Sequence, residues 1–156
     1  MWWCDQRDTR DGTTGRDNTL TRWAAHIQND FKARADWCVA GEYSKANHEP
    51  VPHLQGDSSL AVLHINVPVG QSYTLSAAGS TDPDGDSLSY QWTYYPEAGT
   101  YPGDVKIDDS NSQECSVHIP SDAPGKTSHI VLQVTDNGAP PLTRYRRAVL
   151  TGVRKH

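Results

Sequence analysis

Three aspartates in one short run have the spacing best suited to chemistry. Asp82, Asp84 and Asp86 alternate with a proline and a glycine, and their carboxylates repel one another by roughly a kcal/mol per pair in a wet loop. A bound cation would remove that repulsion, and oxygen ligands suit Ca²⁺. The run is not an EF-hand, because its glycine stands fourth and Thr93 occupies the place of the bidentate glutamate. The alternative is that these aspartates accept hydrogen bonds from backbone amides of their own loop.

Three tyrosines form a second group of candidates. Tyr94 and Tyr95 end a stretch of alternating residues, and Tyr101 follows in a segment that also holds Pro96 and Pro102. Exposed aromatic rings stack on sugar faces while nearby polar groups bond the hydroxyls. The tyrosines are therefore candidate carbohydrate-binding residues, with Tyr95 on the outward side of its strand. The alternative is that they pack the crossover between two strands.

The usual catalytic motifs are missing from the sequence. It has no Gly-x-Ser-x-Gly elbow and no glycine-rich phosphate loop. His48 and His53 are five residues apart with two prolines between them, whereas a zinc-binding HExxH helix needs histidines four apart. The remaining strand histidines fall on outward positions, where exposed polar residues are the usual occupants: His64, His118 and His129. We predict no catalytic residues, so that this chain by itself is not an enzyme.

The cysteines are too few and too scattered for a disulfide framework or a zinc site, both of which need paired or clustered sulfur. Cys4, Cys38 and Cys115 are the three in the chain. A bridge between Cys4 and Cys38 stays open. Cys115 lies in mid-strand on the inward side, so we expect a small buried side chain rather than an activated thiol.

Composition argues against two classes of partner. The 156 residues carry a formal net charge of −5, and no run of Lys or Arg forms the basic stripe that a phosphate backbone requires. Nucleic acid is therefore not expected. No segment approaches the ~20 consecutive apolar residues that span a bilayer, so no membrane span is expected. The first residues do not resemble a secretory signal.

The first part of the chain predicts a loop followed by a helix. Residues 5–18 are polar and contain glycine, which favours a loop. From Asn18 to about Gly41, apolar residues recur at spacings of three and four, as on one face of a helix: Leu20, Ala24, Ile27, Phe31, Ala35 and Cys38. A lone helix is marginal in water. Residues 1–46 are therefore predicted to be the C-terminal remnant of a domain whose body lies upstream.

Residues 47–59 separate two unlike halves. Pro50 and Pro52 disfavour both a helix and a central strand, and glycine and serines follow them. This composition predicts a linker. Residues 60–156 then form the second domain.

After the linker, apolar and polar residues alternate with a period of two, and turn residues interrupt the pattern at regular spacing. Seven strands are predicted, at residues 61–67, 71–78, 88–95, 105–108, 114–119, 129–135 and 143–151. The predicted fold is mainly β, a seven-strand immunoglobulin-like sandwich around Trp92. Alternate loops of such a sandwich share one end. Four aspartates are expected to converge there as candidate metal ligands: Asp82, Asp84, Asp86 and Asp136.

Two loops carry a resemblance to known sandwich modules. The run GSTDPDGDSLSYQW, from Gly79 to Trp92, and the run VTDNGAPPL, from Val134 to Leu142, closely resemble the PKD and cadherin-like families of extracellular domains. The two runs lie within residues 61–151. The cadherin resemblance implies that a Ca²⁺ ion would stiffen the joint with a preceding domain.

Three runs outside these two loops carry a second resemblance. The runs QNDFKARADWC and YSKANHEP, together with YRRAVL near the C-terminus, resemble bacterial cellulose-binding, nucleoside-hydrolase-related proteins. In that family an α/β domain precedes a C-terminal sandwich. The resemblance implies an upstream nucleoside-hydrolase-like domain, a cellulose-like polysaccharide partner and a secreted, periplasmic or cell-surface location. Nothing before residue 18 offers the aspartate cluster with which nucleoside hydrolases hold Ca²⁺ and ribose.

Our leading hypothesis is a non-catalytic accessory module of a carbohydrate-associated protein, supporting glycan binding or domain positioning. One alternative makes the chain a scaffold part of a nucleoside-hydrolase-like N-glycosidic hydrolase. The other makes it a calcium-stiffened spacer of the adhesion kind.

Overall fold

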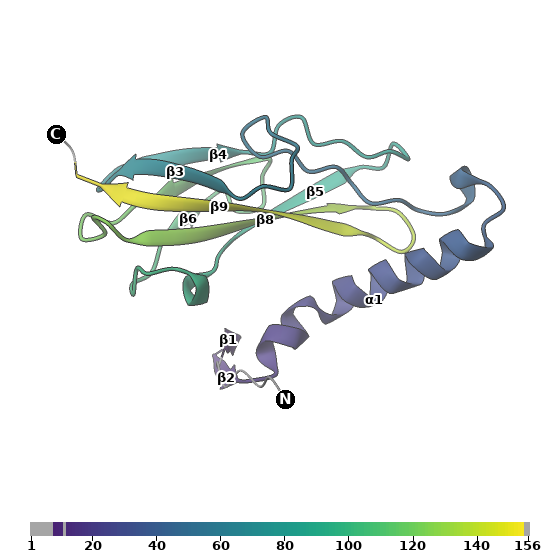
Figure 1. Ribbon diagram of the computed structural model, residues 1–156, viewed down its shortest axis with the longest axis horizontal. Coiled ribbons are helices and arrows are strands. Elements are labelled where there is room, and N and C mark those ends of the chain that lie inside the picture. The colour runs from purple at the N-terminus through teal and green to yellow at the C-terminus, as the bar shows by residue number, and fades with distance from the viewer. Residues whose placement is uncertain (1–7, 11, 155–156) are drawn as a thin grey trace. The chain divides into compact units, whose positions relative to one another are not determined.

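The computed structural model describes residues 8–10 and 12–154, and the chain divides into two compact units, Met1–Ala46 and Asn47–His156. Figure 1 shows the elements of both units. Among the described residues, no helix is both long and apolar enough to cross a membrane.

The first unit contains one long helix and, within the residues predicted to be a loop, a short hairpin, so the loop prediction is wrong at residues 8–10 and 13–15. Strands β1 (Asp8–Arg10) and β2 (Thr13–Gly15) pair antiparallel, and helix α1 spans Asn18–Val39. A single 3-10 turn, η1, follows at Tyr43–Lys45. The predicted helix is present, and its apolar face is largely exposed: Leu20 is 69%, Ile27 57% and Phe31 75% accessible. A helix of this kind gains stability mainly by burying its apolar face, which these side chains do not do here.

The second unit is a two-sheet sandwich. One sheet has the order β3-β9-β8-β5 and the other has the order β4-β7-β6 (Figure 1). The strands are β3 (Leu63–Pro68), β4 (Ser72–Ser76), β5 (Leu88–Tyr94), β6 (Ile107–Asp108), β7 (Glu114–His118), β8 (Thr127–Asp136) and β9 (Thr143–Val153), with the 3-10 turn η2 at Pro96–Ala98. Strand β3 pairs parallel with β9, and the other pairs are antiparallel. The predicted immunoglobulin-like sandwich is confirmed, and all seven predicted strands are present.

The core lies between the inward faces of the two sheets. Leu75 and Val117 from one sheet and Leu132 and Leu150 from the other are fully buried. Trp92 is 3% exposed, and its indole Nε1 donates to the carbonyl of Ser112 at 2.9 Å. Each of these residues occupies the inward position that a period of two predicts for a half-buried strand.

Residues 47–59 have little regular structure, yet they pack against the sandwich. Val51 forms an isolated antiparallel bridge with Thr81. Pro50 and Leu54 are fully buried. The prolines disfavour a helix here, as the sequence indicates, and a tight turn at Gln55 and Gly56 lies between the bridged residues Leu54 and Asp57. A segment that forms no strand can therefore still supply apolar side chains to the core, which a period of two does not reveal.

Candidate functional site

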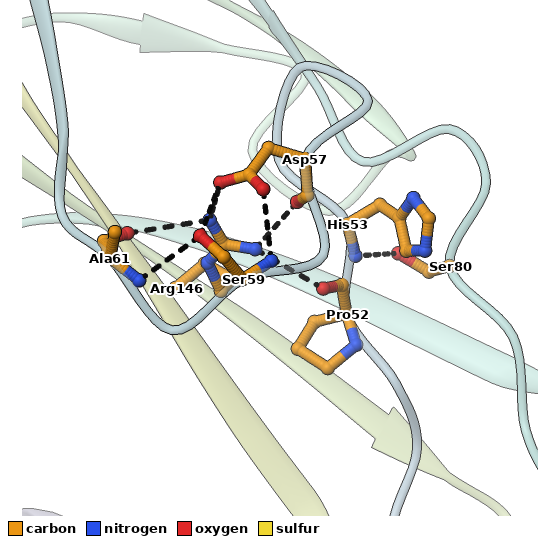
Figure 2. Close-up of polar contacts among 7 residues, drawn as sticks. All are labelled: Pro52, His53, Asp57, Ser59, Ala61, Ser80 and Arg146. Carbon is orange, nitrogen blue, oxygen red and sulfur yellow. Dashed lines mark hydrogen bonds and ion pairs between the residues drawn. The ribbon is translucent and has the colours of Figure 1, made fainter.

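Arg146 is a charged residue at a buried, inward position of β9. Its side chain is 1% exposed. Figure 2 shows its guanidinium surrounded by oxygen atoms: Nη2 bonds the Asp57 carboxylate at 2.8 Å, and the same fork reaches the backbone carbonyls of Asp57, Pro52 and Ala61. A buried charge is tolerated when it is paired and hydrogen-bonded. The guanidinium thereby ties residues 52–61 to the centre of the four-stranded sheet.

Asp57 is held from several sides. Its carboxylate accepts the backbone N–H of Ser59 at 2.9 Å and the Ser59 hydroxyl at 2.8 Å. These two bonds, followed by the guanidinium, lower the pKa of Asp57 to about 2. Because of this low pKa, the carboxylate stays ionised opposite the buried guanidinium over the whole physiological range. In the same region, the backbone N–H of His53 donates to the Ser80 hydroxyl at 2.9 Å (Figure 2).

A second anchor lies at the start of this segment. The side-chain amide of Asn47 donates to Asp136 Oδ1 at 3.1 Å and to the carbonyl of Pro140 at 2.8 Å. The same carboxylate oxygen accepts the backbone N–H groups of Gly138 and Leu142. A Cβ atom at position 138 would overlap the Asn47 side chain, so glycine is required there for close approach. Asp136, only 3% exposed, thus organises the β8–β9 loop and holds Asn47.

The predicted aspartates lie together at this end of the sandwich. Asp82 Oδ1 accepts the backbone N–H groups of Asp84 at 2.8 Å and Asp86 at 3.1 Å. Asp84 Oδ2 accepts the backbone N–H of His48 at 2.6 Å. The pKa of Asp86 is raised, first by burial and then by the charges of Asp82, Asp136 and Asp84. Hydrogen bonding to the loop backbone, the alternative to metal binding, therefore accounts for several of the carboxylate oxygens.

The fit of this cluster to a cation is mixed. Asp82 Oδ2 and Asp136 Oδ2 are buried and accept no hydrogen bond within the described part of the chain, and carboxylate oxygens are the donors that Ca²⁺ prefers. Over residues 8–10 and 12–154, however, no three His, Cys, Asp or Glu side chains are arranged so that they could hold a metal ion. Calcium binding at these aspartates stays a prediction.

The three candidate tyrosines do not form one exposed row. Tyr101 is 8% exposed, and its hydroxyl donates to Asp122 at 2.8 Å. The Tyr94 hydroxyl donates to the carbonyls of Tyr101 and Gly103 at 3.3 and 3.1 Å. Both tyrosines therefore pack the β5–β6 crossover, which was the alternative interpretation, because alternation points Tyr94 inward and the crossover folds back over it. Tyr95 is half-buried and comes directly after β5.

The other candidates from the sequence have ordinary settings. Cys115 is 2% exposed, so the expected buried side chain is confirmed, and burial raises the pKa of its thiol to about 12. Cys38 is free and exposed, and Cys4 lies outside the described residues. The outward strand histidines are exposed at two positions, His64 and His118, and half-buried at His129.

The profile of a family described as "Cellulose-binding protein Sde0182, C-terminal domain" matches residues 72–152, more than half of the chain. The chain belongs to this family. The matched residues run from the start of β4 to Gly152 in β9 and include Arg146 and all four predicted aspartates.

A solved structure from Saccharophagus degradans is similar over a longer range. It is described as a nucleoside hydrolase-related hypothetical protein that is associated with carbohydrate metabolism, and it shares 48% identity with a TM-score of 0.84. The match covers 85% of this chain and 32% of that chain. This chain therefore spans about a third of the relative's length. The resemblance noted in the sequence is confirmed.

More distant structures are similar to the sandwich. The PKD domain from KIAA 1837 protein has 18% identity and a TM-score of 0.43, covering 71% of this chain and 95% of that chain. Mouse cadherin-23 EC22-24 has 18% identity and a TM-score of 0.47, covering 67% of this chain and 33% of that chain. No curated protein sequence matches the chain.

Two anchoring residues of this family member were missed from the sequence. Arg146 stands between the outward-facing Tyr145 and Arg147, in register with the core residues Ala148 and Leu150. A charged residue at an inward strand position is a detectable signal, because it must have a buried partner. Asn47 gave no such signal, since asparagine in a proline-containing loop is common and its partners are 89 and 93 residues away.

Proposed function

We propose that this chain is a non-catalytic accessory module of a carbohydrate-associated protein, which supports glycan binding and fixes the polypeptide that enters its sandwich. The main support for this proposal is that residues 47–61 are anchored to the sandwich. Asn47 is bonded to Asp136 at one end of the segment, and Asp57 is bonded to the buried Arg146 at the other. We call residues 47–61 the entry segment. A domain that binds its own entry segment at both ends holds that segment in one defined position, which is what a positioning module requires.

The carbohydrate part of the proposal is supported by the comparisons. The family is described as a cellulose-binding protein domain, and the Saccharophagus relative as associated with carbohydrate metabolism. We propose a cellulose-like polysaccharide as partner, an upstream nucleoside-hydrolase-like domain as neighbour, and a secreted, periplasmic or cell-surface location. Hydrolysis of an N-glycosidic bond, if the whole protein performs it, is assigned to that neighbour.

Two measurements test the proposal together. The full chain should be retained on microcrystalline cellulose in a pull-down from which bovine albumin is washed away, and it should not hydrolyse purine or pyrimidine nucleosides. Recovery of the chain only in the wash, from cellulose and from a panel of other plant polysaccharides, would refute glycan binding. Nucleoside turnover that follows the purified chain through two chromatographic steps would refute the non-catalytic assignment.

A second candidate function is a calcium-stiffened spacer. It is favoured by the raised pKa of Asp86 beside Asp82, Asp84 and Asp136, and by two buried carboxylate oxygens that accept no hydrogen bond from the residues that the structure describes. A Ca²⁺ ion would neutralise the repulsion between these groups. We expect a higher melting temperature in 2 mM Ca²⁺ than in EGTA, about 3 °C or more for a domain of this size. Equal melting temperatures would end this candidate.

A further inference from the structure

The outward face of the four-stranded sheet has a composition unlike the rest of the molecule. The chain contains 19 Asp and Glu residues. None of them stands at an outward position of β3, β5, β8 or β9, as read from the register of these described strands with the buried residues of β8. These positions hold serine, threonine, asparagine, glutamine, histidine, tyrosine, valine, one proline and one exposed arginine, Arg147.

The outward face of the other sheet does not share this property. Strand β6 carries Asp108 outward and strand β7 carries Glu114 outward, and both are exposed. The absence of carboxylates is therefore a feature of one face, while acidic residues occur on the opposite one. A polar surface that is nearly uncharged suits a partner that is itself uncharged and polar, since neither side has to desolvate an unpaired charge.

Amide groups and a tyrosine form a row across the middle of this face. Gln91 on β5 is in register with Gln133 on β8, and Gln133 is in register with Tyr145 on β9. Neighbouring strands are about 4.8 Å apart, so the three side chains follow one another across the sheet. Gln91 is exposed, and Gln133 and Tyr145 are half-buried. Each amide offers both a donor and an acceptor, which is the pairing capacity that a sugar hydroxyl requires.

A second row of side chains, which contains Tyr95 and His129, lies four residues away from Gln91 and Gln133 along β5 and β8. The backbone N–H of Tyr95 donates to the carbonyl of His129 at 2.8 Å, which continues the β5–β8 ladder, and both His129 and His64 are aligned with Val149 of β9. From strand geometry, Tyr95 and Tyr145 stand about 16 Å apart along a diagonal of the sheet. Two aromatic residues at that separation, with amides between them, can contact several consecutive sugar rings of one extended chain.

We infer that the outward face of β5, β8 and β9 binds a neutral, hydroxyl-rich polysaccharide chain, with Gln91, Gln133 and Tyr145 as its central contacts. This inference rests on the proposed function and names the surface that performs it. A nucleic acid or an acidic polysaccharide would need a row of cations, and Arg147 is the single arginine or lysine at the outward positions of these described strands. A protein partner would need a larger apolar centre, whereas Val149, one of the few outward apolar residues, is 5% exposed.

The test uses the full chain with microcrystalline cellulose and cellohexaose as probes. In the double variant Gln91→Ala/Gln133→Ala, retention on cellulose should fall, and the Kd for cellohexaose should rise about tenfold or more, because two side-chain amides are lost. The matched control is Thr74→Ala/Ser116→Ala, a cross-strand pair on the outward face of the other sheet, and it should bind like the unmodified chain. Unchanged melting temperatures establish that the variants fold.

A second variant covers the case in which the double variant unfolds. Gln91→Glu places a carboxylate on the edge strand β5 at an exposed position, and it should weaken binding by a similar factor. Full binding by folded variants of this face would overturn the inference and leave the proposed function standing. Failure of the unmodified chain to bind cellulose, cellohexaose and a panel of other neutral polysaccharides would overturn both.

Discussion

Burying a guanidinium in a sandwich core costs free energy unless every N–H group donates to an oxygen atom. Two of the three guanidinium nitrogens of Arg146 donate such hydrogen bonds. The guanidinium reaches one carboxylate and three backbone carbonyls, all contributed by residues 52–61. Its Nε is buried and unbonded within the described residues. Because all of these oxygen atoms belong to residues 52–61, the hydrogen bonds of the guanidinium depend on the docking of that segment against the sandwich.

The first prediction is that Arg146→Met destabilises the chain by about 2–3 kcal/mol, since the hydrogen bonds of a charged group are lost while the apolar volume is largely kept. The matched control is Arg147→Met, at the neighbouring exposed position, which should change stability by no more than about 0.5 kcal/mol. Urea denaturation of both variants measures the difference. Equal midpoints for the two variants would show that the buried network does not stabilise the fold.

The second prediction concerns acid. The pKa of Asp57 is lowered to about 2, first by the Ser59 backbone N–H, then by the Ser59 hydroxyl and Arg146. A carboxyl whose folded pKa is depressed stabilises the fold above its unfolded pKa of about 4 and loses that contribution as the pH falls toward 2. The gap in melting temperature between the unmodified chain and Asp57→Asn should therefore be constant above pH 5 and close between pH 4 and pH 2. A gap that stays open at pH 2 contradicts the assignment.

The third prediction separates two aspartates of one loop. Burial and three neighbouring carboxylates raise the pKa of Asp86, so its charge opposes folding at neutral pH. Without added Ca²⁺, Asp86→Asn should raise the melting temperature at pH 7. Asp82→Ala should lower it, because Asp82 accepts the backbone N–H groups of two loop residues. Calorimetry in EGTA compares them, and a lower melting temperature for Asp86→Asn would contradict the repulsion argument.

At the scale of elements, the segment before β3 is the part whose role changes most between sequence and structure. Composition predicts a linker at residues 47–59, and in the structure the segment belongs to the compact unit that begins at Asn47. Glu49 adds an ion pair with Arg144 at 2.9 Å. The segment thus behaves as an extra, irregular edge of the sandwich, with side chains in the core and backbone bonds to the β4–β5 loop.

The fourth prediction compares two leucines near this edge. Leu54 is fully buried and Leu60 is 90% exposed. Leu54→Ala should destabilise the chain by about 2–5 kcal/mol through lost burial and a residual cavity, while Leu60→Ala should lie within about 0.5 kcal/mol of the unmodified chain. Denaturant midpoints decide between them. A mild effect at position 54 would mean that the segment is not packed in solution.

At the scale of the whole molecule, the division at Ala46 gives the fifth prediction. Residues 47–156 should fold alone and melt within a few degrees of the full chain, because their core and both anchors lie within that unit. Residues 60–156, the boundary that composition indicates, should melt well below this, because Leu54 and the partners of Arg146 and Asp136 are deleted. Thermal melts of the two fragments test this, and equal stability would restore the linker interpretation.

The sequence by itself determined the sandwich, its seven strands, the central Trp92 and the inert Cys115, because a period of two fixes which side of each strand meets the core. It also indicated the family, through short runs in helix α1, in the segment that follows it and in strand β9. Such patterns can be recognised in the sequence because the residues that form them are close together in the chain.

Only the tertiary structure decided which loop and strand residues stabilise the fold through long-range contacts. Arg146 meets Asp57 across 89 positions and Asn47 meets Asp136 across the same separation, and Tyr101 turns inward onto Asp122. No local period encodes such pairs, because each depends on how the crossover and the entry segment fold back on the sheets. The uncharged row of Gln91, Gln133 and Tyr145 likewise exists only once β5, β8 and β9 are placed in register.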